Sequence, residues 1–196
     1  KNVITLNSMF HSCKNLTSLD LLHFNTSKVT DMSAAFIHCK GLKTLKISNW
    51  DTSKVTNFAY TFQECMALEE LNIARWDTSS ATDMQAMFVS CSSLTSLDIS
   101  RWDVSKVENM RSTFNKTYKI TTLDLTRWNT ESLKNMDSAF ANSGIETLDL
   151  ENWNVSQVTS MVSTFEGCQQ LTDLKISTWD TSSVTTMHNI FDNCQK

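Results

Sequence analysis

The sequence predicts an α/β repeat solenoid, with one parallel β-sheet on one face and short helices on the opposite face. Three periodic patterns predict it. Phenylalanine recurs every 26 residues with one step of 25, at positions 10, 36, 62, 88, 114, 140, 165 and 191. Tryptophan keeps this spacing at 50, 76, 102, 128, 153 and 179. A Leu-x-x-Leu-x-Leu/Ile pattern recurs with the same period. A fixed period of roughly 20 to 50 residues is typical of solenoids, whose units bury apolar faces against their neighbours. We therefore expect about seven units in one solenoid over residues 1–196.

Each unit opens with a predicted strand. In Leu42-Lys-Thr-Leu45-Lys-Ile47 the last residues alternate, so Leu45 and Ile47 are expected to point inward and Thr44 and Lys46 outward. Because the pattern repeats in register, we expect the strands to form one continuous parallel sheet. The predicted strands are residues 16–21, 42–47, 68–73, 94–99, 120–125, 145–150 and 171–176.

A turn follows each strand. It carries Trp-Asp-Thr-Ser or a close variant, and its Asp or Asn stands at Asp51, Asp77, Asp103 and Asn129. Such side chains accept a hydrogen bond from their own backbone two residues on, which would fix the corner of the unit.

A short helix is predicted for the last part of each unit. Met84, Phe88 and Cys91 are spaced i, i+4 and i+7, which places them on one helical face. The residue before the methionine position is Asp31, Asn57, Asp83, Asn109, Asn135, Ser160 or Thr186. Each could accept a hydrogen bond from the free amides of a first helical turn.

Composition narrows the class of function. The net charge of −4 provides no overall field for nucleic acid or an anionic membrane, so no nucleic-acid partner is expected. No run of 18 apolar residues occurs, and residues 1–15 lack a signal-peptide pattern. We therefore expect no direct membrane insertion by this segment. Lys1–Val3 match Ser27–Val29, part-way through a unit, and Cys194–Lys196 stop before the next leucine. The chain is thus interpreted as a piece of a longer protein.

Two motifs carry a resemblance to a known family. The pattern Phe-x-x-Cys-x-x-Leu-x-x-Leu-x-Ile at residues 36–47 and 88–99 resembles the repeat of BspA-like leucine-rich repeat surface proteins. The Trp-Asp-Thr-Ser-x-Val-Thr-x-Met pattern, which residues 76–84 follow with alanine in the valine place, is similar to the variant in bacterial surface proteins and lipoproteins. The resemblance implies a curved parallel-sheet solenoid, an extracellular, cell-surface location and roles in adhesion or host contact. It implies no catalytic residues.

Six cysteines share one position of the repeat: Cys13, Cys39, Cys65, Cys91, Cys168 and Cys194. Thr117 and Ser143 occupy the same position in the other units, so the site requires a small side chain rather than a bonding partner. No Cys-x-x-Cys occurs, and the four histidines share no repeat position. We expect buried free thiols, with no metal site and no cofactor.

The tryptophan row and the threonine rows could each have either a binding function or a structural role. The tryptophans could stack on sugars, but Phe24 replaces one of them and apolar positions flank the row, which favours a buried ladder. Regular hydroxyl rows can bind ice. Here Val104, Val155, Glu108 and Lys134 interrupt the threonine rows, which favours a structural role. At residues 141–147 the unit is one residue shorter, and irregular stacking is expected there.

The candidate binding site is the outward face of the strands. One row reads Asp20, Lys46, Asn72, Asp98, Asp124, Asp149 and Lys175, and a second row three residues later contains Arg75, Arg101 and Arg127. The candidate binding residues are Asp98, Asp124, Asp149, Arg75, Arg101 and Arg127. These rows could bind a polar, charged partner. They could equally form ion pairs within a unit, Asp98 with Arg101 and Asp124 with Arg127, each contributing about 0–1 kcal/mol when exposed.

The sequence therefore predicts a non-enzymatic, surface-displayed adhesion module that binds a protein or glycan on a host or neighbouring cell through a concave sheet face. No carboxylate pair, Ser-His-Asp set or glycine-rich phosphate loop stands out from the repeat, so no enzyme is expected. The alternatives are a passive or self-assembling stalk, whose ends associate head to tail, and a carbohydrate-binding module that uses the tryptophans.

Overall fold

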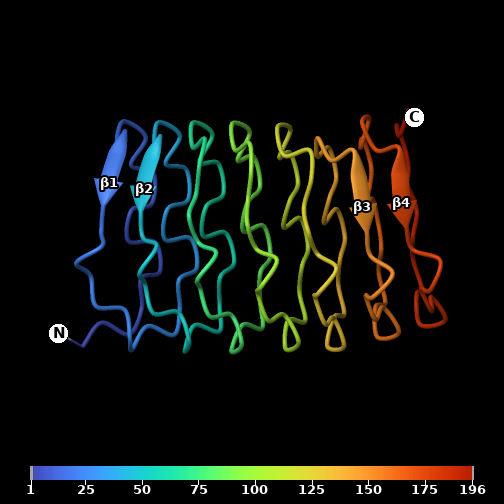
Figure 1. Cartoon of the computed structure of the whole chain (residues 1–196), viewed down its shortest axis with the longest axis horizontal. Coiled ribbons are helices and arrows are strands. Elements are labelled where there is room, and N and C mark those ends of the chain that lie inside the picture. Colours follow the sequence, from blue (N-terminus) through green and yellow to red (C-terminus); the bar gives the residue numbers. More distant parts are fainter. Residues whose placement is uncertain (1, 196) are drawn as a thin grey trace.

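The chain forms a row of flat coils stacked side by side from the N-terminus to the C-terminus, as the computed structural model shows (Figure 1). The structure describes residues 2–195. Lys1 and Lys196, which belong to the expected fragment ends, lie outside the described residues. Each coil of the chain contributes one layer, and the core runs along the whole row between the two faces.

Four short strands lie on one face of the row. They are β1 (Ser18–Asp20), β2 (Thr44–Lys46), β3 (Thr147–Asp149) and β4 (Asp173–Lys175). β1 pairs with β2 and β3 pairs with β4, both in parallel, with Leu19 opposite Leu45 and Leu148 opposite Leu174. The parallel direction and the inward leucines were predicted. One continuous sheet was wrong, because residues 68–73, 94–99 and 120–125 form no strand.

Both regular strand pairs place opposite charges on facing outward positions. The register sets Asp20 opposite Lys46 and Asp149 opposite Lys175, so both regular pairs carry opposite charges across the ladder. In the units between them, Asp98 and Asp124 occupy successive outward positions. Opposite charges across strands stabilise pairing and like charges oppose it. The backbone bonds from Leu21 N to Lys46 O and from Leu150 N to Lys175 O have no counterpart between residues 47 and 125 of the described chain.

A second parallel ladder runs along the whole row on the other side of the unit. It consists of bridges that join residues one unit apart, in the order Thr5, Asp31, Asn57, Asp83, Asn109, Asn135, Ser160 and Thr186. These are the positions expected to cap helices. Most of these side chains accept a hydrogen bond from the amide two residues on, as in Ala59 N to Asn57 Oδ1 at 2.9 Å and Gln85 N to Asp83 Oδ1 at 2.8 Å. At Ser160, the hydroxyl instead donates to Asp137 Oδ1, which also accepts the Val162 N–H.

The predicted helices are wrong, because the segment after this ladder forms consecutive tight turns and the described residues contain no helix. In this segment the backbone amides alternate between two kinds of acceptor, a carbonyl of the next unit and a carbonyl three residues back in the same unit. Met84 N and Phe88 N donate to Asn109 O and Thr113 O of the next unit, at 3.0 and 2.9 Å. Met87 N and Cys91 N donate to carbonyls three residues back, at 3.2 and 3.0 Å. A helix would use every interior amide for i to i−4 bonds, leaving none for the next unit. The turns place Met84, Phe88 and Cys91 in the core, so their i, i+4, i+7 spacing reflects consecutive turns rather than a helix.

Left-handed residues make these turns possible. Two positions of each turn segment have positive φ in most units, for example Ala86 at 54° and Ser90 at 57°. Gly167 occupies the second position with φ of 68°. For other residues this conformation costs about 1 kcal/mol or more, so the bonds to the next unit must offset the strain.

The core is built from two aromatic ladders. Phe36 stacks on Phe62 at 5.6 Å between ring centroids with 4° between planes, and each later phenylalanine continues the stack at 5.5 to 5.7 Å. Trp76 stacks on Trp102 at 6.4 Å. The Trp102 Nε1–H donates to Ile73 O of the preceding unit at 3.2 Å, and the tryptophans from Trp50 to Trp179 repeat this type of bond. Trp76, Trp102 and Trp128 are buried, which confirms the core ladder.

The shortened unit does not interrupt these ladders. Gly144 is the one residue between Ser143 and Ile145, where the longer units have two residues between the corresponding positions, as between Cys39 and Leu42. A Cβ at Gly144 would lie 2.0 Å from Tyr118 O, so the backbone passes directly against the preceding unit. Phe140 still stacks on Phe165 at 5.5 Å with 4° between planes. The shorter unit therefore changes the backbone only near Gly144, and the irregular stacking expected for this unit does not occur in the phenylalanine ladder.

The cysteines are free thiols in the structure, as predicted. Each buried thiol donates to the carbonyl of the preceding phenylalanine position, as in Cys91 Sγ to Phe62 O at 3.2 Å. Thr117 Oγ1 makes a comparable bond to Phe114 O at 2.7 Å. The position therefore selects a small side chain that can donate a hydrogen bond to a backbone carbonyl.

We expect Trp102→Ala to lower the free energy of unfolding by about 3–5 kcal/mol, because it removes a buried ring and leaves a cavity in the ladder. Urea unfolding followed by circular dichroism would measure the change. Trp179→Ala is the control, because Trp179 is only half-buried and should cost less. A loss below about 1 kcal/mol for Trp102→Ala would contradict the buried ladder.

We expect Cys91 to resist alkylation in the folded protein. Burial raises the pKa of its thiol from 9.0 to about 12. The thiolate is the reactive form, so its fraction near pH 8 should fall about a thousandfold relative to the unfolded chain. Iodoacetamide labelling, with peptide mapping of native and urea-unfolded samples, would measure this. Equal labelling rates, or three intact disulfides by non-reducing mass spectrometry, would contradict the free buried thiols.

The same pKa shift predicts a loss of stability at alkaline pH. The folded pKa of Cys91 lies above the unfolded value of 9.0, so its stabilising contribution is complete below about pH 9. That contribution should be lost as the pH rises through about 12, because the unfolded thiol ionises first. Comparing the wild type with Cys91→Ser in urea unfolding between pH 7 and pH 11 would isolate it. An unchanged difference between the two proteins over that range would contradict the prediction.

Candidate functional site

The candidate site is the outward surface of the strands and of the equivalent residues between them, here called the strand face. The strand pattern places Leu45 inward and leaves Thr44 and Lys46 exposed, and Asp98 and Asp124 are exposed at the corresponding place. Two rows define the strand face. The acidic row contains Asp20, Lys46, Asn72, Asp98, Asp124, Asp149 and Lys175. The arginine row contains Arg75, Arg101 and Arg127.

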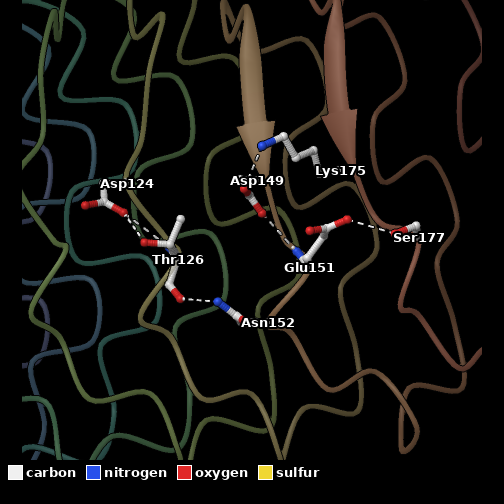
Figure 2. Close-up of polar contacts among 7 residues, drawn as sticks. All are labelled: Asp124, Thr126, Asp149, Glu151, Asn152, Lys175 and Ser177. Carbon is white, nitrogen blue, oxygen red and sulfur yellow. Dashed lines mark hydrogen bonds and ion pairs between the residues drawn. The ribbon is translucent and has the colours of Figure 1, made fainter.

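Each aspartate of the acidic row uses one carboxylate oxygen to fix its own backbone. Asp124 Oδ1 accepts the Thr126 N–H at 3.2 Å and the Thr126 hydroxyl at 2.7 Å, and Asp149 Oδ1 accepts the Glu151 N–H at 3.2 Å (Figure 2). Asp98 bonds Ser100 in the same way, with a 2.9 Å hydroxyl contact. The carboxylates are therefore held in fixed orientations with one oxygen directed away from the turn bond.

The ion pairs of the strand face join neighbouring units. Lys175 Nζ lies 3.2 Å from Asp149 Oδ2, as Figure 2 shows, and Lys46 Nζ lies 3.2 Å from Asp20 Oδ2. Within the described residues, neither Asp98–Arg101 nor Asp124–Arg127 forms an ion pair, so the predicted pairing within a unit is wrong. The pairing was predicted because each arginine follows its aspartate by three residues. In the structure the two carboxylates instead accept hydrogen bonds from Ser100 and Thr126.

Hydrogen bonds, more than ion pairs, set the charge state of this row. Thr126 hydroxyl and backbone donors lower the pKa of Asp124, with a smaller contribution from Arg127. For Asp149, the Glu151 backbone amide lowers the pKa most and Lys175 adds to it. Both groups are open to solvent, so these carboxylates are ionised at neutral pH and available to a partner.

The arginine row has a different environment from the other residues at its repeat position. Asn49 Nδ2 donates to Leu22 O at 2.6 Å, and Asn152 Nδ2 donates to Thr126 O at 3.0 Å. The Thr178 hydroxyl makes the same kind of bond to Glu151 O. Arg75, Arg101 and Arg127 are exposed and form no hydrogen bond or ion pair with any residue in the described chain. Their guanidinium groups are open to solvent.

Two hollows meet at Asn72 on the strand face. One, of about 430 Å³, is lined by Lys43, Thr44, Leu45, Glu69, Glu70 and Asn72. The other, of about 510 Å³, is lined by Ser48, Asn49, Trp50, Asn72 and Arg75. Both lie beside β2, on the side where residues 68–73 form no strand. Sequence reasoning did not single out Asn49, Asn152 or Glu151. The signal available for Asn49 and Asn152 was their shared repeat position with the arginine row.

The threonine rows are structural. Thr52 and Thr78 are buried, and their hydroxyls donate to Asp77 O and Asp103 O of the next unit, at 2.9 and 2.8 Å. Thr56 and Thr82 donate to carbonyls of the preceding unit, at 3.3 and 3.2 Å. These hydroxyls link neighbouring units, which agrees with the structural role expected from the interrupted rows.

The described residues contain no group of three His, Cys, Asp or Glu side chains placed to hold a metal ion. Over the same residues, no helix has the length and hydropathy required to cross a bilayer.

A family profile described as "Mycoplasma protein of unknown function, DUF285" matches residues 4–123 and 135–196. No curated protein matches the sequence. Among solved structures, a leucine-rich repeat protein from T. pallidum is similar, with a TM-score of 0.46 and 17% identity over 89% of this chain and 63% of its own. A leucine-rich repeat protein from Bacteroides ovatus has a TM-score of 0.28 and 15% identity over 98% of this chain and 68% of its own. This chain thus spans less than two thirds of the T. pallidum protein.

Proposed function

Because this chain belongs to the DUF285 family, we propose that it is a non-enzymatic binding module that presents its strand face to a partner. One observation carries the proposal. The central units expose three arginines that contribute no bond to the fold, beside aspartates whose orientation is fixed by their own backbone. Exposed charged side chains that form no bond within the protein are available to bind a partner of opposite charge.

The chemistry of the remaining reactive groups supports a role without catalysis. The buried thiols of Cys65 and Cys91 have pKa values raised by burial, which disfavours the nucleophilic thiolate. The carboxylates of the strand face have lowered pKa values at Asp124 and Asp149, which makes them poor general acids at neutral pH. We therefore assign binding and no reaction to this module.

We further propose display at the cell surface and adhesion to a protein or glycan of a host or neighbouring cell. Support comes from the resemblance of residues 36–47 and 76–84 to BspA-like surface repeats. The regular ladders also support it, because a solenoid offers a long rigid face on which many weak contacts can add up. The buried tryptophans do not favour the alternative that uses them as a sugar platform.

We expect the double variant Asp124→Lys with Arg127→Glu to weaken binding at least about tenfold toward any partner found on an array of matrix proteins and glycans. Reversing both charges preserves the net charge but inverts the local pattern. The matched control reverses Glu131 and Lys106, which are exposed and outside both rows. Biolayer interferometry would give the affinities. Unchanged binding by the strand-face variant would place the site elsewhere.

A second candidate function is head-to-tail assembly, and the two end faces of the described solenoid favour it. One end has a hollow of about 530 Å³ lined by Val3, Leu6, Met9 and Phe24 among others. The other has a hollow of about 470 Å³ lined by Leu171, Leu174, Phe191 and Cys194 among others. Phe191 is 45% exposed, although it stacks on Phe165 at 5.6 Å. Phe10 of a second copy could continue that ladder, as a heterologous contact that need not close into a ring.

We expect an isolated copy of this segment to associate weakly and reversibly, with a sedimentation coefficient that rises with concentration. Phe191→Asp should make it monomeric, because a charge on the end face opposes stacking onto the apolar hollow of a second copy. Tyr118→Asp is the control, because Tyr118 is exposed along the row rather than on an end face. A strictly monomeric wild-type segment at high concentration would refute this assembly.

A further inference from the structure

Residue type at the arginine position divides the units into two groups with different structural roles. Where the residue is Asn49, Asn152 or Thr178, its side chain bonds a backbone carbonyl of the preceding unit. Where it is Arg75, Arg101 or Arg127, the bond is absent and the side chain is exposed. The arginines thus replace a stabilising contact with a free cation, which a purely structural role does not account for.

The three arginines are consecutive along the row, so their charges lie side by side. Like charges at equivalent positions of neighbouring units repel one another. No ion pair within the described chain neutralises this repulsion, although Arg127 also interacts electrostatically with Asp124. An anionic group bound between neighbouring guanidinium groups would relieve it. Guanidinium binds carboxylate and sulfate through paired N–H donors, which makes arginine better suited to such ligands than lysine.

Acceptors for neutral hydroxyl groups lie next to the arginines. Asp98 and Asp124 each keep one carboxylate oxygen outside the bonds that they make to Ser100 and Thr126. Asn49 and Asn72 line the hollow of about 510 Å³ together with Arg75. A ligand for this surface therefore carries anions for the arginines and hydroxyl groups for the carboxylates and amides.

We propose that the arginine row binds an acidic polysaccharide, that is, a linear chain of sugars with carboxylate or sulfate groups, laid across the strands along the solenoid axis. This proposal rests on the proposed binding function of the strand face and names its ligand class. The surface repeats one pattern of aspartate, hydroxyl residue and arginine in two units, as Asp98, Ser100 and Arg101 and then as Asp124, Thr126 and Arg127. A periodic polymer can meet such a surface in the same way at each unit.

Two other polyanions fit less well. Single-stranded nucleic acid is usually held by exposed aromatic rings that stack on its bases, and Trp76, Trp102 and Trp128 are buried here. An extended acidic peptide alternates its side chains between two faces, so it presents only every second carboxylate to the arginines. Neither polymer offers a dense row of hydroxyl groups to the aspartates.

The test compares two triple variants that remove the same amount of charge. Arg75→Asn, Arg101→Asn and Arg127→Asn together remove the row and introduce the residue that bonds the backbone in other units. Lys28→Asn, Lys54→Asn and Lys106→Asn are the control, since these exposed lysines share a different repeat position. The probes are hyaluronan and heparin oligosaccharides, neutral dextran, polyglutamate and oligo(dT). Calorimetry gives the affinities, and thermal unfolding gives the stability of each variant.

We expect the wild type to bind at least one acidic oligosaccharide and not dextran. The arginine variant should bind it more weakly by about tenfold or more per arginine, with an unfolding temperature equal to or above that of the wild type. The lysine variant should keep most of the affinity. An equal loss in both variants, or polyglutamate or oligo(dT) binding as tightly as the oligosaccharides, would overturn the proposal. So would a marked fall in the unfolding temperature of the arginine variant, because the arginines would then be structural.

The outcome also separates this proposal from the function on which it rests. If a protein from the array binds through Asp124 and Arg127 while no acidic oligosaccharide binds, the ligand class is wrong and the binding module stands. If reversal of Asp124 and Arg127 has no effect on an array partner, the strand face is not that partner's site. Oligosaccharide binding lost in the arginine variant would still support the arginine row in that case.

Discussion

The structure depends on backbone hydrogen bonds that pass from each unit to the next. In the turn segments every second amide, such as Met84 N and Phe88 N, donates to a carbonyl one unit further along the chain. A unit alone could not satisfy these groups, and leaving a buried amide unpaired is costly. The requirement for a neighbour explains the exact superposition of equivalent residues, because a shift by one residue would break the whole ladder at once.

That superposition turns repeated residues into continuous ladders of side chains. Phenylalanine rings stack at 5.4 to 5.7 Å from Phe10 to Phe191, and tryptophan indoles bond the carbonyls of the preceding unit. These contacts offset the strain of left-handed residues such as Ala86 and Ser90. The free energy is thus distributed along the row, which leaves the outward residues comparatively free to vary and to bind.

The strand face shows how charge modifies this scaffold. β1–β2 and β3–β4 each carry an aspartate opposite a lysine, and both form regular parallel pairs. Between them, Asp98 and Asp124 stand in successive units, as do the three arginines, and single backbone bonds such as Thr95 N to Glu69 O replace regular pairing. The exposed arginines therefore lie in the units that lack regular strand pairing.

The sequence by itself determined the period, the buried ladders, the Asp51-type turns and the small-residue position of the cysteines, because each depends only on which residues recur one unit apart. It also located the acidic and arginine rows. Tertiary structure decided the rest. The i, i+4, i+7 spacing of Met84, Phe88 and Cys91 fits both a helix and a chain of turns, and only bonds to the next unit favour the turns. Likewise, Asp98 and Arg101 are close in sequence, but the bond from Asp98 to Ser100 fixes the carboxylate and leaves the guanidinium unpaired. Hydrogen-bond partners from the next unit made the first choice. A side-chain bond within the unit made the second, because one aspartate can turn either to its own backbone or to the arginine.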